Sequence, residues 1–147
     1  MAIYTERLSE SLAIVATVDP ASYSAQANSD GVDMQLFRRC LFVITAGAIG
    51  SNTVTATIKG GNDNVTFATT LTSKSIAAGT FSGSGDNNKQ ALIEVIDQEC
   101  ATQNVRYIRL ELVPSGAALL SAVALAGEAR YEPSSDYNLA SVAEIVA

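Results

Sequence analysis

Apolar and polar residues alternate with a period of two along much of this chain, which is the pattern of strands with one buried face. Residues 53–59 place Val, Ala and Ile on one side and threonine and lysine on the other, and residues 105–113 alternate in a similar way. Further runs suited to strands occupy residues 12–18, 65–71 and 89–97. Glycine, asparagine and proline clusters separate these runs and predict turns.

Two segments are apolar on both sides. Residues 40–44 form a continuous apolar run, and residues 117–129 are small and apolar on both faces. We interpret the first run as a central strand that is buried on both faces, inside a sandwich or a closed barrel. Arg38 and Arg39 precede it and must point to opposite faces of a strand, so at least one of them leaves the core or meets a carboxylate.

The turn clusters predict how neighbouring strands connect. Glycines in residues 46–52 predict a hairpin between the central strand and residues 53–59, and residues 114–116 predict a second hairpin with the last strand. Residues 72–88 read as a long loop that is functional or partly strand-like. One short helical turn is expected at residues 98–104.

About seven or eight strands with almost no helix predict an all-β fold, a single-domain antiparallel β-sandwich with the jelly roll as the leading topology. We expect an N-terminal arm at residues 1–11, the sandwich at 12–130 and a C-terminal arm at 131–147. In the last arm Leu139, Val142 and Ile145 recur every third residue, as on one side of a short helix. Such a helix is too short to be stable alone and needs a partner in its own chain or another.

Composition and charge limit the classes of partner that this chain could bind. The chain is 48% hydrophobic and only 16% charged, which suggests that part of its surface is covered by something else. The net charge of −6 argues against nucleic acid as a partner, because binding requires clustered lysine and arginine. We expect neither a secretory signal nor a membrane partner, because the apolar run at residues 12–18 is too short.

The two cysteines, Cys40 and Cys100, leave two readings open. They are either two buried thiols or a bridged pair, and the sequence does not test the geometry of a bridge. The low cysteine count favours folding in a reducing cytoplasm.

The residues give little support to catalysis. The chain has no histidine, which excludes histidine-based catalysis and histidine metal sites. Pairs of acids for glycosidic chemistry could come from Glu94, Asp97, Glu99 and Glu111, but acids on a solvent-facing side of strands explain them more simply. We therefore predict no enzyme activity, no cofactor and no metal.

Two small groups of side chains suit contacts with other molecules. Tyr107, Arg109 and Tyr131 would suit a protein interface or a sugar, and ordinary cross-strand pairing is the alternative; we favour the interface. The two ends of the chain supply further candidates for contact with another protein or with a second copy, which are Tyr4, Arg130, Tyr131, Tyr137, Leu139, Val142 and Ile145.

Several stretches, taken in order, resemble a family of small virion proteins of tailed bacteriophages that are encoded beside the major capsid protein. The stretches are Val32-Asp33-Met34 with Phe37-Arg38-Arg39, Asp86 with Lys89-Gln90-Ala91-Leu92-Ile93-Glu94-Val95, Arg106-Tyr107-Ile108-Arg109, Ala129-Arg130-Tyr131, and Ser135-Asp136 with Leu139-Ala140-Ser141-Val142. None of them is a catalytic signature, and together they touch most of the chain.

The resemblance implies a capsid decoration (cement) protein with a jelly-roll-like sandwich. Such a protein is made in the host cytoplasm, sits on the outer capsid surface as a small homo-oligomer, a dimer or trimer, and bridges major capsid protein subunits. Two alternatives stay open. One is a virion-associated carbohydrate-binding module, against which the absence of tryptophan counts, and the other is a tail or connector structural protein.

Overall fold

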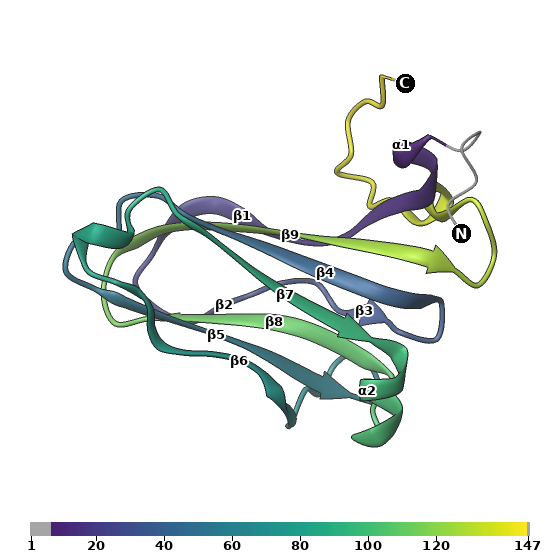
Figure 1. The fold of residues 1–147 in the computed structure, drawn as a ribbon, viewed down its shortest axis with the longest axis horizontal. Coiled ribbons are helices and arrows are strands. Elements are labelled where there is room, and N and C mark those ends of the chain that lie inside the picture. The colour runs from purple at the N-terminus through teal and green to yellow at the C-terminus, as the bar shows by residue number, and fades with distance from the viewer. Residues whose placement is uncertain (1–6, 147) are drawn as a thin grey trace.

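The computed structural model describes residues 7–146, and within strand β6 it describes the side chains of residues 69–71, 74, 81 and 82. Two antiparallel sheets face each other in a sandwich (Figure 1), which confirms the predicted all-β, single-domain class. The strands are β1 (Leu12–Tyr23), β2 (Ala27–Asn28), β3 (Val32–Asp33), β4 (Phe37–Ala46), β5 (Thr53–Gly61), β6 (Thr69–Ser82), β7 (Gln90–Ile96), β8 (Tyr107–Pro114) and β9 (Ala118–Ala129). The helical turns are α1 (Leu8–Ser11), η1 (Ser84–Asp86), α2 (Asp97–Thr102) and η2 (Ser134–Tyr137).

The order of the strands is that of a jelly roll. One sheet, called here the β4 sheet, has the order β1-β9-β4-β7, and the other, the β5 sheet, has the order β2-β8-β5-β6 with β3 also paired to β8. The pairs are nested along the chain: β1 with β9, β2 and β3 with β8, β4 with β7, and β5 with β6. If β2 and β3 count as one interrupted strand, eight strands form the two Greek keys of that topology.

Both predicted hairpins are wrong. Strands β4 and β5 lie in different sheets, and so do β8 and β9. The turn after β4 instead bonds to the start of β9, where Gly47 N–H donates to the Leu119 carbonyl (2.8 Å) and Leu119 N–H donates to the Ala48 carbonyl (3.0 Å). A turn signal locates where the chain reverses, but here each reversal carries the chain from one sheet to the other.

The core lies between the sheets and follows the predicted alternation. From the β4 sheet Phe42 and Ile44 are fully buried, and β9 adds a row of buried alanines. From the β5 sheet Ile58, Leu110 and Leu112 are fully buried. Full burial of each large side chain stabilises the fold by about 1.5–3 kcal/mol.

Three other predicted elements can be compared with the structure, and their outcomes differ. The helical turn expected near residues 98–104 is confirmed as α2. The long segment at residues 72–88 is largely strand β6 followed by η1, and Phe81 of β6 is buried in the core. The helix expected from Leu139 to Ile145 is absent from the described residues, which form a turn at residues 140–141 and no regular element after η2.

The C-terminal segment packs against its own chain at one place. The Tyr137 ring meets the Phe37 ring edge-on at 5.3 Å between centroids. Ile14 N–H donates to the Asn138 side-chain oxygen (2.7 Å), and Leu139 N–H donates to the Ile14 carbonyl (2.8 Å). These two bonds occupy backbone groups of the edge strand β1 that a sheet neighbour would otherwise take. As a result α1 and the last described residues lie at the same end of the sandwich (Figure 1).

Candidate interaction surface

The candidate acids from the sequence lie on three elements, and only Asp97 and Glu99 share one of them, the short helix α2. Glu94 is exposed on β7, Glu99 bonds Lys74 (2.9 Å) beside α2, and Glu111 is buried on β8. Burial opposes ionisation of Glu99, but the hydrogen bonds from Lys74 and from the Ile96 N–H outweigh it, so its pKa is lowered. Among the residues described, no group of three or more His, Cys, Asp or Glu is placed to hold a metal ion.

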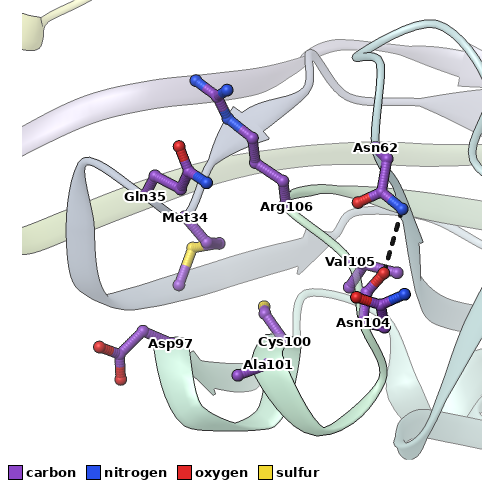
Figure 2. A pocket seen from close by; sticks show the side chains of 9 residues that line it. All are labelled: Met34, Gln35, Asn62, Asp97, Cys100, Ala101, Asn104, Val105 and Arg106. Carbon is purple, nitrogen blue, oxygen red and sulfur yellow. Dashed lines mark hydrogen bonds between the residues drawn. The ribbon is translucent and has the colours of Figure 1, made fainter.

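A hollow of about 270 Å³ lies at one end of the sandwich, between α2 and the start of β8 (Figure 2). Arg106 lines the hollow. Its guanidinium donates to both carboxylate oxygens of Asp33 (3.0 and 2.5 Å), and its Cζ lies 4.8 Å from the centroid of the Tyr107 ring. The Asn62 side-chain amide donates to the Asn104 carbonyl (3.1 Å), as the dashed line in Figure 2 shows. Arg106, the cation of this hollow, is therefore already paired within the chain, and the carboxylate of Asp97 also lines the hollow.

The cysteines are free and buried, in keeping with the reading of two buried thiols. Burial raises the pKa of Cys40 to about 12, with a further contribution from Cys100. Burial, and then the charges of Glu99 and Asp97, raises the pKa of Cys100 to about 11. Because the thiolate is the nucleophile, neither group is reactive near neutral pH.

The outward side of the β4 sheet is apolar over neighbouring strands. In the cross-strand register Leu41 lies beside Leu125, and Val43 lies between Val123 and Leu92. Leu92 is 63% exposed and Leu119 is 46% exposed, whereas the others are half-buried against one another. We call this surface the apolar outer face, and it consists of Leu41, Val43, Leu92, Val123 and Leu125. The polar row of Thr45, Ser121 and Gln90 separates it from Leu119, and Glu94 lies beside Leu41.

The end of this face that is nearest β1 forms a groove of about 310 Å³ against the chain ends. We call it the tail groove, and its apolar walls are Leu8, Leu12, Ile14, Leu125, Val142 and Ile145. Leu8 is 73% exposed and Ile145 is 51% exposed at its margin. The tail groove thus joins both ends of the described chain to the apolar outer face.

The outward side of the β5 sheet is polar. Strand β5 presents threonines and Lys59, whose ammonium donates to the Thr70 hydroxyl (2.6 Å). On β8 the carboxylate of Glu111 accepts hydrogen bonds from Gln26 (2.6 Å) and Arg109 (3.2 Å). The Arg109 guanidinium also lies over the Phe67 ring at 4.6 Å. The charges on this face are held by partners from the chain itself.

The candidate contact residues are divided among several places. Val142 and Ile145 line the tail groove, and Leu139 and Tyr137 are half-buried where the tail meets the sandwich. Arg130 and Tyr131 are exposed just after β9, and Tyr4 lies outside the described residues.

The suggested group of Tyr107, Arg109 and Tyr131 is not one surface. Tyr107 and Arg109 point outward from β8 in the β5 sheet, whereas Tyr131 follows the last strand of the β4 sheet. Tyr107 is stacked with Arg106, and Arg109 with Phe67, so both side chains are engaged within the chain.

Sequence reasoning missed the apolar outer face. It interpreted residues 40–44 as buried on both faces, but Leu41 and Val43 are only half-buried, and Arg38 and Arg39 are exposed, the latter 3.5 Å from Glu128. The sequence did contain a signal for this face, because the runs that form β4 and β9 are apolar on both sides. The structure adds that these two strands pair with each other in the middle of one sheet.

No protein-family model matches the sequence, and no curated protein matches it. Among solved structures, the chain is similar to one in the structure of the infectious bursal disease virus Gt strain, with 14% identity over 84% of this chain and a TM-score of 0.48. It spans about a third (34%) of that chain's length. It is also similar to the SPBc2 prophage-derived protein YomS, with 8% identity over 78% of this chain and 95% of that one, at a TM-score of 0.44. A pectin-binding carbohydrate-binding module matches 75% of this chain and 71% of its own, with 14% identity and a TM-score of 0.33.

Proposed function

We propose that this chain is a structural protein of a bacteriophage particle, which decorates the outside of the capsid and stabilises it by bridging major capsid protein subunits. The ordered stretches that resemble virion proteins support this proposal. The described residues add a compact jelly roll with five ion pairs between its own side chains and two buried, unreactive thiols. Within residues 7–146, no helix has the length and apolar character needed to cross a membrane.

The observation that carries the proposal is the exposed apolar tail beside the tail groove. The tail is bonded to β1 at Asn138 and Leu139, and beyond that point Ile145 is 51% exposed and Val146 is 87% exposed. Apolar side chains at the end of an anchored segment are suited to a pocket on another protein. Many copies of such a contact across a shell would add up to a strong clamp through multivalency.

The test uses purified protein and capsids that lack it. We expect saturable binding at a fixed stoichiometry, measured by co-sedimentation with the capsids, and a higher temperature of capsid disruption. Absence of saturable binding by the unaltered chain would end the proposal.

A matched pair of variants locates the contact. Val146→Asp places a charge at the end of the tail, and Val65→Asp places the same charge on an equally exposed valine (78%) in the turn after β5. We expect Val146→Asp to weaken capsid binding at least tenfold and Val65→Asp to leave it unchanged. Equal loss in both variants would show that the tail is not the contact.

A further inference from the structure

A second hollow of about 270 Å³ adjoins the one in Figure 2, at the same end of the sandwich. The two hollows share Met34, Gln35 and Asp97 as lining residues, so we call them together the end groove. Its walls come from the chain between β3 and β4, from α2 and from the ends of β4 and β9. The last residue that lines it is Arg130, so the tail contact proposed above does not use this groove.

Two arginines of the end groove have no partner within the described chain. Of the nine Lys and Arg residues, five form ion pairs, and the Lys59 ammonium donates to the Thr70 hydroxyl. Three cations remain within residues 7–146, and two of them, Arg38 and Arg130, line the same hollow. The chain has 15 Asp and Glu residues that could have paired with them. Free guanidinium groups that meet at one hollow are suited to carboxylates from another molecule.

The position of Arg38 follows from the period of two along β4. Arg38 lies on the same side of the strand as Cys40 and Phe42, which are fully buried. The adjacent Arg39 belongs to the opposite side, where its Nε lies 3.5 Å from the Glu128 carboxylate. Of the two adjacent arginines, the outward one therefore meets a carboxylate of its own chain. The inward one leaves the core at the open end of the sandwich, where it lines the end groove.

Two acids also line the hollow, and they leave both arginines available. The Glu128 carboxylate is the partner of Arg39. Asp97 is the first residue of α2, and within residues 7–146 no ion pair joins it to Arg38 or Arg130. Three arginines therefore face two carboxylates here, which makes the hollow locally positive on a chain of net charge −6. An acidic partner is repelled by most of the chain and attracted here, which gives the contact its orientation.

The other lining residues favour a protein segment over a sugar. The side-chain amides of Gln35 and Asn104 have no hydrogen-bond partner among the described residues, so they are available to the peptide groups of an extended segment. Phe37 is the one aromatic residue that lines either hollow, and it is buried, so a sugar would find no ring on which to stack.

We propose that the end groove binds an acidic segment of a partner protein, with carboxylates of the segment on Arg38 and Arg130 and its peptide groups on Gln35 and Asn104. An arginine can hold a carboxylate through two parallel hydrogen bonds, which fixes the direction of approach. This inference goes beyond the proposed function, which rests on the tail, and does not depend on it.

The probe is a peptide of alternating glutamate and glycine with about eight residues, which spans about 27 Å when extended. It is titrated into the isotope-labelled full chain and followed by NMR. At about 50 mM NaCl we expect saturable shifts of the Gln35, Arg38 and Arg130 signals, with a dissociation constant below about 1 mM. Binding should weaken at least fivefold at about 0.5 M NaCl, because salt screens exposed charges.

Two further probes define the ligand. The same peptide with glutamine in place of glutamate should bind at least tenfold more weakly. Free glutamate at the same carboxylate concentration should give smaller shifts that do not saturate. Absence of saturable shifts with the acidic peptide, shifts confined to other parts of the chain, or equal binding of the glutamine peptide would overturn the inference. Equal binding of free glutamate would overturn it too, because the site would then hold a small carboxylate and not a protein segment.

Three glutamine variants test the site. Arg38→Gln and Arg130→Gln each remove one guanidinium from the end groove, and both residues are exposed. Lys89→Gln is the matched control, since its side chain is 60% exposed and it lies at the opposite end of β7 from α2. We expect each arginine variant to weaken peptide binding at least fivefold and Lys89→Gln to leave it unchanged. If circular dichroism shows that one arginine variant is unfolded, the other decides. Full binding by a folded arginine variant, or an equal loss in Lys89→Gln, would overturn the inference.

Discussion

Leucines and valines occupy two rows on the outward side of the β4 sheet, whereas the outward side of the β5 sheet carries mostly threonines and charged groups. Both sheets contribute equally buried inward residues, such as Ile44 and Ile58. The inward residues follow from the need for a core and tell little about function. The outward residues are not needed by that core, so the difference between the two outer faces is informative about partners.

The two outer faces also differ in how many hydrogen bonds their side chains make. On the β5 sheet, Glu111 is buried and its carboxylate holds Gln26 and Arg109 in place. On the β4 sheet, the corresponding positions are occupied by side chains that make no hydrogen bonds, such as Val43 and Leu125. A face whose polar groups bond to one another needs no partner. Exposed apolar side chains leave water only when another surface covers them.

The largest expected effect separates the inward from the outward side of β4. Phe42→Ala empties a fully buried site and should lower the free energy of unfolding by about 3–5 kcal/mol. Val43→Ala removes two methyl groups from the half-buried outward side and should cost about 1 kcal/mol or less in the single chain. Urea unfolding at low protein concentration measures both values. Equal losses would mean that the outward side is already buried within the chain.

A smaller loss is expected on the polar face. Glu111→Ala removes the acceptor shared by Gln26 and Arg109, and leaves a guanidinium whose Nε is buried without a partner. Stability should fall by about 2–3 kcal/mol, as for a buried charge that loses its partner. A variant that unfolds no earlier than the unaltered chain would contradict the view that hydrogen bonds hold this face.

Acid should weaken the polar side selectively. Burial raises the pKa of Asp33, but its hydrogen bonds from Arg106 and Gln35 and the charge of Arg106 outweigh this effect, so the pKa lies below the usual 3.8. A carboxyl with a lowered pKa stabilises the fold above its unfolded pKa, and that stability is lost as the pH falls through the folded pKa. The advantage of the unaltered chain over Asp33→Asn should therefore shrink below about pH 4 in urea unfolding.

The control for this experiment lies on the other sheet. Glu94→Gln removes an exposed charge on β7 and should change the free energy of unfolding at pH 7 little. An unchanged difference between the unaltered chain and Asp33→Asn from pH 7 to about pH 2 would exclude a contribution from the Asp33–Arg106 pair.

Much of the local structure could be predicted from the sequence. Alternation along residues 53–59 defined the inward and outward sides of β5 correctly, and glycine and asparagine clusters marked where strands end. The candidate contacts were harder to find, because the sequence directed attention to the ends of the chain. Val142 and Ile145 do line a groove, but its other wall comes from Leu8, Ile14 and Leu125, which lie far away in sequence.

The sequence by itself determined an all-β chain, the position of most strands and the presence of two strands that are apolar on both sides. Only the tertiary structure decided that β4 pairs with β9 rather than forming a hairpin with β5, and that the second apolar side of both strands faces outward. The physical reason is that alternation is a property of neighbouring residues, so it gives each strand two distinct sides. The hydrophobic effect has no direction, and therefore the contacts between strands distant in the chain determine which side is buried and which remains for a partner.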